Sequence, residues 1–121
     1  MNNLEVSLDE RLVQFAGEVI LFTKELKKDA IGIYFSDQIG RSAAGAALNF
    51  GEFQGGESKK DKIHKLGIVL KEINETRIAL RIIIYINQSS NDKAINLLSE
   101  ANQLGEIIAS IIKKKKIGEK I

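Results

Sequence analysis

The apolar residues of this chain fall into four long segments, and within each segment they recur every three to four positions. This spacing is typical of helices that bury one face. The sequence contains no proline, so no residue of that kind interrupts a long helix. We therefore predict an all-α protein that folds as an antiparallel up-down four-helix bundle, with short connections between sequential helices.

Capping and breaking residues predict where these helices begin and end. Ser7 and Glu10 form a possible capping box, which predicts that the first helix begins at Ser7 and ends before 29–32. The second helix is expected from about Phe35 to Gln54, because two glycines follow it.

A second capping box, Ser58 with Asp61, predicts the start of the third helix. A polar turn over 87–91 separates it from the fourth helix, which is expected to end in Lys113–Lys116. The whole chain, 1–121, is expected to be one domain with a core over about 7–116 and a frayed tail over 117–121.

Each predicted helix carries one apolar stripe, and together the stripes predict the core. The first two stripes are Leu8, Leu12, Phe15, Val19, Phe22 and Leu26, and then Phe35, Ile39, Ala43, Ala46, Phe50 and Phe53. The last two are Ile63, Leu66, Leu70, Ile73, Leu80 and Ile84, and then Ile95, Leu98, Ala101, Leu104, Ile108, Ile111 and Ile112.

Composition excludes several classes of protein. The chain has no cysteine, so disulfides and thiolate metal sites are excluded and a cytoplasmic location is the expectation. The first ten residues lack the pattern of a signal peptide, and no apolar run is long enough to cross a membrane. We therefore expect no membrane association.

The second helix has an unusual outer face. On a helical wheel, Gly40, Ala44, Leu48 and Gly51 form a face that solvent would cover in a monomer. A helix whose side chains are small or apolar on nearly every face is usually buried by other parts of the protein on nearly every face. We therefore predict that this face is the interface of a homo-oligomer. The alternative is a poorly soluble surface helix.

A polar stripe lies beside the core stripe of the same helix. It includes Gln38, Arg41, Asn49 and Glu52, with Ser42 and Gly45 between them. Arg41 and Glu52 are expected to be buried partners, because a buried charge is tolerated only when it is paired. We prefer this structural role to a catalytic one.

The sequence offers little for catalysis. It has a single histidine, His64, so neither a Glu-x-x-His metal pair nor a Ser-His-Asp triad can be assembled. Glu72 and Glu75 lie one turn apart on the third helix, where acid–base work and ion pairing are both possible and ion pairing is preferred. We predict a protein that is not an enzyme and that has no metal, no cofactor and no small-molecule substrate.

Basic residues concentrate in the second half of the chain. Residues 1–58 hold five basic and nine acidic side chains, and residues 59–121 hold thirteen and seven. In an up-down bundle, the start of the third helix and the end of the fourth lie at the same pole. Eight lysines should gather there: Lys59, Lys60, Lys62, Lys65, Lys113, Lys114, Lys115 and Lys116.

The lysines at the start of the third helix oppose its dipole, which disfavours cations at a helix N-terminus. Binding to the phosphate backbone of RNA or DNA is one explanation for such an arrangement, and a purely solubilising pole is the other. With two tyrosines and no tryptophan, base stacking and sequence-specific readout are not expected. A protein-interaction scaffold without a nucleic-acid role is the alternative function.

Several motifs resemble one known family. They are Gln38-Ile39-Gly40-Arg41-Ser42 with Asn49-Phe50-Gly51-Glu52, Ser58-Lys59-Lys60-Asp61 with Ile63-His64-Lys65-Leu66, Leu70-Lys71-Glu72 with Glu75-Thr76 and Leu80-Arg81, and Glu100-Ala101 with 108–113. Over residues 10 to 116 the chain resembles the 23S rRNA intervening-sequence proteins. It departs from the family pattern at Gly45 and Ala46, at Lys62, and within 77–79, where a Tyr-Trp pair is common.

The resemblance implies an antiparallel four-helix bundle that assembles into a homo-oligomer, commonly a pentameric ring. Some members of the family are encoded within insertions in bacterial 23S rRNA genes. A related branch serves as the accessory protein of diversity-generating retroelements and engages nucleic acid and reverse transcriptase. No enzymatic activity is implied.

Overall fold

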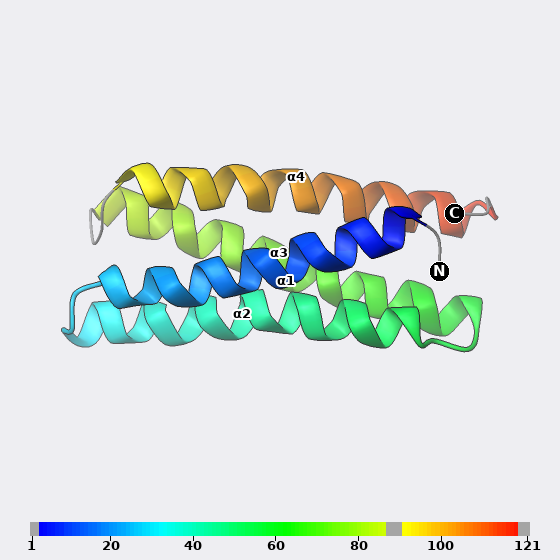
Figure 1. Ribbon diagram of the computed structural model, residues 1–121, viewed down its shortest axis with the longest axis horizontal. Coiled ribbons are helices and arrows are strands. Elements are labelled where there is room, and N and C mark those ends of the chain that lie inside the picture. Colours follow the sequence, from blue (N-terminus) through cyan, green and yellow to red (C-terminus); the bar gives the residue numbers. More distant parts are fainter. Residues whose placement is uncertain (1–2, 87–90, 119–121) are drawn as a thin grey trace.

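The computed structural model describes residues 3–86 and 91–118 and consists of four long helices, which confirms the predicted all-α bundle (Figure 1). The helices are α1 (Asn3–Phe22), α2 (Ala30–Gln54), α3 (Lys59–Ile86) and α4 (Asn91–Lys116), and the short 3-10 helix η1 (Thr23–Glu25) follows α1. The helices alternate in direction. Helix α2 packs on α1 and α3, and α4 packs on α3 and, more loosely, on α1.

The first helix begins earlier than predicted. It starts at Asn3, so Ser7 lies inside the helix and the predicted capping box with Glu10 is wrong. Neither glycine nor proline precedes Ser7, and each residue added to an existing helix gains a backbone hydrogen bond. The predicted core stripe of this helix is nevertheless confirmed, since Leu8, Leu12, Phe15, Val19, Phe22 and Leu26 are all buried.

The second helix also begins earlier, at Ala30 instead of Phe35. Asp29 is its N-cap, and the Asp29 Oδ1 atom accepts a hydrogen bond of 2.8 Å from the Gly32 amide. The helix ends as predicted at Gln54, with Gly55 as the C-cap. Its core stripe is confirmed at Ile39, Ala43, Ala46, Phe50 and Phe53, and Phe35 is half-buried.

The predicted start of the third helix is confirmed. The Asp61 amide donates a 3.0 Å hydrogen bond to the Ser58 hydroxyl, and the helix begins at the next residue, Lys59. The predicted turn over 87–91 lies almost wholly outside the described residues, as does most of the predicted tail, 119–121.

The face that the fourth helix buries differs from the predicted one near its start. Ala94 and Leu97 are buried there, whereas Ile95 is 49% exposed and Leu98 is half-buried. The buried positions 94, 97, 101, 104, 108 and 111 alternate spacings of three and four, which keeps a single seam against the bundle. The prediction chose the larger Ile95 for the core, whereas the small Ala94 beside it is the residue that packs against the bundle.

Candidate nucleic-acid interface

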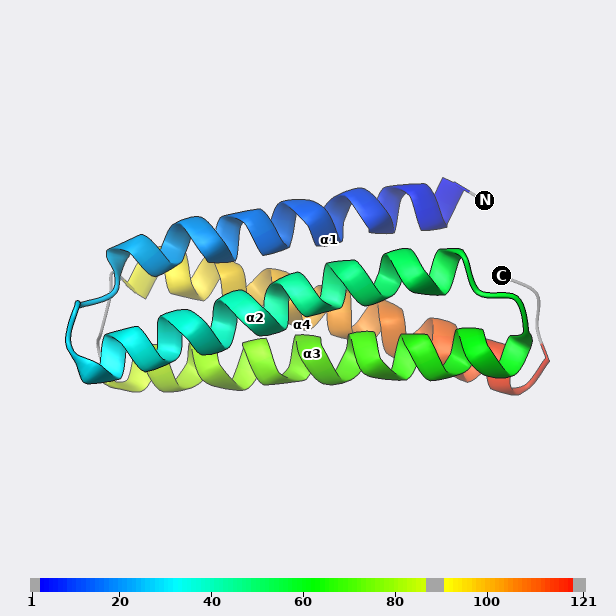
Figure 2. The ribbon, with the colours of Figure 1, turned by 90° about the horizontal axis from the view of Figure 1, so that it is seen from below.

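The eight lysines of the predicted basic pole lie at one end of the bundle. The α2–α3 connection and the end of α4 meet at the end of the bundle where α1 begins (Figure 2). We call Lys59, Lys60, Lys62, Lys65 and Lys113–Lys116 the lysine pole. Lys59, Lys60, Lys113, Lys114 and Lys116 are exposed, and the other three are half-buried.

Two lysines of the pole are held by neighbouring side chains. The Lys65 Nζ atom donates a 2.6 Å hydrogen bond to Glu52 Oε1, which raises the pKa of Lys65 above its ordinary value. Lys115 places its ammonium 5.6 Å from the centre of the Phe53 ring, within the range of a cation–π contact. These contacts fix two cations of the pole and leave Lys59 and Lys60 open to solvent.

Acidic residues at the same end reduce the positive charge of the pole only in part. Glu52 is paired with Lys65, and Asp61 lies in the first turn of α3 with Glu57 just before the helix. Asp9 and Glu10 near the start of α1 lie at the same end, and the eight lysines outnumber these five carboxylates. Exposed ammonium groups on two neighbouring helix ends can contact phosphates without reading base identity.

The structure does not bring Arg41 and Glu52 together as buried partners, and that prediction is wrong. Both side chains are exposed: Arg41 pairs with Asp37 at 3.0 Å, and Glu52 pairs with Lys65. Each finds its partner close by, one on the same helix and one across the short α2–α3 connection. Solvated pairs of this kind avoid the desolvation that a buried pair must offset.

The buried polar contact between α2 and α3 is made by hydroxyls. Ser42 and Thr76 are buried, and their hydroxyl oxygens lie 2.5 Å apart. Thr76 also donates to the Glu72 carbonyl at 2.9 Å, so both hydroxyls are satisfied without a charge. Asn49 donates to the Gly45 carbonyl at 2.8 Å on the same side of α2. Sequence reasoning treated Ser42 as one polar position among several and missed its partner.

Glu72 and Glu75 form a carboxyl pair with each other instead of the ion pairs we preferred. Glu72 packs against α2 at Gly45, where a Cβ atom would overlap the Glu72 Oε2 atom. Burial raises the pKa of Glu72, and a hydrogen bond and the negative charge of Glu75 raise it further, whereas Lys71 lowers it. Gly45, which departs from the family pattern, therefore makes room for this carboxyl group.

The raised pKa of Glu72 predicts a pH dependence of stability. The folded state holds this proton more tightly than the unfolded state, so its contribution is complete below the ordinary glutamate pKa and is lost as pH rises through the raised pKa. The Glu72→Gln variant should lose this dependence and, at neutral pH, gain a few tenths of a kcal/mol from relief of like charge. Urea unfolding at a series of pH values measures it, with the exposed Glu106→Gln as control. A wild-type-like pH profile in Glu72→Gln would contradict the assignment.

The predicted oligomer face of α2 is open in the protomer. Leu48 is 69% exposed, and a Cβ atom added at Gly40 or Gly51 would meet nothing within 4 Å. Ala44 is half-buried. Other helices could therefore approach the α2 backbone closely at this face.

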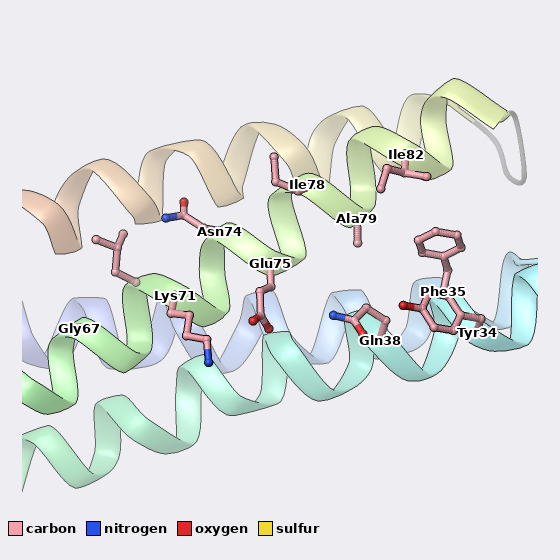
Figure 3. Close-up of a pocket in the computed structure, with 11 residues that line it drawn as sticks. Tyr34, Phe35, Gln38, Gly67, Lys71, Asn74, Glu75, Ile78, Ala79 and Ile82 are labelled. Carbon is pink, nitrogen blue, oxygen red and sulfur yellow. The ribbon is translucent and has the colours of Figure 1, made fainter.

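A groove between α2 and α3 was missed by the sequence analysis (Figure 3). Its volume is about 670 Å³, and Tyr34, Phe35, Ile78 and Ile82 form apolar walls near one end. Gln38, Lys71, Asn74 and Glu75 line the more polar part. A signal was present in α3, because Gly67, Lys71, Asn74, Ile78 and Ile82 recur at helical spacing beside the core stripe.

Within residues 3–86 and 91–118, His, Asp and Glu side chains nowhere gather in threes that could hold a metal ion. In the same ranges, no helix is both long and apolar enough to span a membrane.

Comparison with known proteins identifies the family. The model of the 23S rRNA-intervening sequence protein family matches residues 5–110. The chain belongs to this family. The match includes α2 and α3, whose signature residues supply the Ser42–Thr76 contact, the Glu72–Glu75 pair and the first half of the lysine pole. No protein in the curated set matches significantly.

A solved structure from the same group shares the fold. It is a protein of unknown function from the S23 ribosomal protein family of Bacteroides thetaiotaomicron, with 27% sequence identity and a TM-score of 0.81. The similarity covers 88% of this chain and 98% of that one. This member of the 23S rRNA-intervening sequence protein family therefore shares its bundle with a solved structure whose own function is unknown.

Proposed function

We propose that this protein is a non-enzymatic, self-associating bundle that binds the phosphate backbone of RNA or DNA through its lysine pole. The observation that carries the proposal is the gathering of eight lysines at one end of the bundle, on the ends of two adjacent helices. Lys59 and Lys60 are exposed at the N-terminus of α3, where the helix dipole disfavours them. Phosphate contacts offset that cost.

Self-association strengthens such binding. One protomer presents few free ammonium groups, and contacts with a handful of phosphates bind weakly at physiological salt. Several poles in one assembly act together, which raises avidity without any new type of contact. The open face of α2, with Gly40, Ala44, Leu48 and Gly51, supports self-association, and the pentameric ring known in the family is the assembly we expect.

A charge-reversal pair tests nucleic-acid binding. The Lys59→Glu/Lys60→Glu variant leaves the Lys65–Glu52 pair intact and should bind labelled structured RNA at least about tenfold more weakly at low salt. The matched control is Lys27→Glu/Lys28→Glu, which makes the same change in charge at the other end of the bundle. Fluorescence anisotropy measures both. Equal losses in the two variants, or none in either, would contradict a role for the lysine pole.

Light scattering of the purified protein tests self-association. An assembly of several protomers is expected, and Leu48→Glu should reduce its mass by placing a charge on the open face of α2. A monomer at every concentration tested would overturn this half of the proposal.

The second candidate function is a protein-interaction scaffold, and the apolar groove between α2 and α3 favours it. In that case the lysines only keep the protein soluble. A protein partner that stays bound after nuclease treatment, and that binds Lys59→Glu/Lys60→Glu as well as the wild type, distinguishes this scaffold from a nucleic-acid binder.

A further inference from the structure

Helix α1 carries a second apolar stripe, which the described part of the chain leaves about half exposed. Val13, Ile20 and Leu21 are 52%, 46% and 49% exposed, on the side of α1 that faces away from the core. Gly17 lies between them, and a Cβ atom there would meet nothing within 4 Å. We call these four residues the α1 ridge. Three large apolar side chains on one exposed helix face are an unpartnered surface.

The groove between α2 and α3 is a second uncovered apolar surface, and its shape suits a helix. Tyr34, Ile78 and Ile82 line it and are 60%, 41% and 40% exposed. Figure 3 shows Lys71 and Glu75 directed from α3 towards α2, further along the same groove. The groove is thus apolar at the Ile82 end and charged near its middle.

The ridge is short enough to fit within the groove. The nine residues from Val13 to Leu21 span about 12 Å along α1, and the twelve from Lys71 to Ile82 span about 17 Å along α3. With α1 parallel to α3, Gly17 can lie opposite Ile78, so that a large side chain meets a position without a Cβ atom. Leu21 then lies near Ile82.

Charge selects the parallel orientation. In that register, Glu10 lies opposite Lys71, which forms no ion pair with any residue in the described part of the chain. Glu10 is exposed, and its Oε1 atom accepts a 3.2 Å hydrogen bond from Gln14 on the same helix. The antiparallel orientation brings Lys24 towards Lys71 instead. Like charges facing each other across an interface disfavour that arrangement.

We propose that the α1 ridge of one copy packs into the α2/α3 groove of the next copy, parallel to α3. This inference rests on the proposed self-association and adds a second contact to the open face of α2 described above. In Figure 2, α1 runs along one edge of the bundle and α3 along the other, so the helix that carries the ridge and the helix that carries one wall of the groove lie on different sides of the protomer. The contact is therefore head-to-tail, and it closes into a ring when the rotation between copies permits.

Cysteine pairing tests the contact cleanly, because the sequence contains no cysteine. The variants Ile20→Cys and Ile82→Cys are purified separately, mixed, allowed to exchange subunits and treated with a short bismaleimide. Covalent dimers are expected in the mixture and not in either variant alone, because only a ridge–groove contact brings these two positions together. The matched control mixes Ile20→Cys with Ile95→Cys, an isoleucine of similar exposure on α4, and should give no dimers.

The outcomes separate this inference from the proposed function. An assembly in light scattering without dimers between positions 20 and 82 overturns the ridge–groove contact and leaves self-association standing. A monomer in light scattering overturns both.

A charge exchange tests the orientation. Glu10→Lys and Lys71→Glu should each weaken assembly several-fold, and the double variant should restore it, measured as the concentration at half-dissociation. Additive losses in the double variant would overturn the parallel register.

Discussion

The Phe50→Ala variant is expected to lose about 3–5 kcal/mol of unfolding free energy, the usual cost of deleting a fully buried phenylalanine ring. Phe50 is completely buried in α2, and its ring lies 5.1 Å from that of Phe53, centre to centre. The protein would relax only in part around the cavity. A loss of this size is a large fraction of the stability of a small domain.

Urea unfolding followed by circular dichroism measures this loss. Tyr85→Ala is the control, because it also removes an aromatic ring but from a side chain that is 90% exposed in α3. It should change the unfolding free energy by no more than about 0.5 kcal/mol. Similar losses in the two variants would mean that the core does not lie where the structure places it.

The Gly32→Ala variant is expected to cost about 1–3 kcal/mol, although alanine is the better helix former. A Cβ atom at position 32 would overlap the backbone carbonyl oxygen of Lys27, which cannot move as the end of a flexible side chain can. The segment before α2 would have to shift. The Asp29 cap, which accepts its hydrogen bond from the Gly32 amide, would be disturbed with it.

A second glycine in a helix provides the matched control. At Gly105 in α4, an added Cβ atom would lie at ordinary contact distance, 3.6 Å, from the Ile73 side chain. Gly105→Ala should therefore stabilise the protein by about 0.5–1 kcal/mol through helix propensity. Thermal or urea unfolding of both variants gives the comparison. A stabilised Gly32→Ala would contradict the close approach of the segment before α2.

Much of the fold followed from periodicity alone. All six predicted positions of the first apolar stripe, from Leu8 to Leu26, are buried, because a single apolar face recurs there without competition. The start of α4 was harder, since Ile95 and Leu98 looked better suited to the core than the small Ala94. Only the packing against α3 decides which of two adjacent faces turns inward.

Helix boundaries were predicted well where a backbone signal was local and unopposed. Ser58 capped α3 as expected, and Gly55 ended α2. Ser7 failed because a capping residue does not prevent a helix from beginning earlier when the preceding residues tolerate helical structure. Asp29 was passed over as part of a break although it caps α2.

The candidate site was less predictable because it depends on contacts between helices. The gathering of the lysines at one pole followed from topology, since an up-down bundle fixes which helix ends are neighbours. The pairing of charges could not be predicted in this way, because Arg41 and Glu52 each form an ion pair with a nearby residue instead of with each other. The groove was missed because it exists only between α2 and α3, and neither helix reveals it alone.

The salt dependence of nucleic-acid binding tests the central claim most directly. The apparent association constant for structured RNA, and for an unrelated RNA of equal length, should fall steeply and in parallel as salt rises from low to physiological concentration. In Lys59→Glu/Lys60→Glu, the slope of log K against log salt should be smaller by about 2, one unit for each lost phosphate contact. Three results would contradict a backbone-binding lysine pole: an association constant that does not change with salt, a strong preference for one RNA sequence, or no binding at low salt.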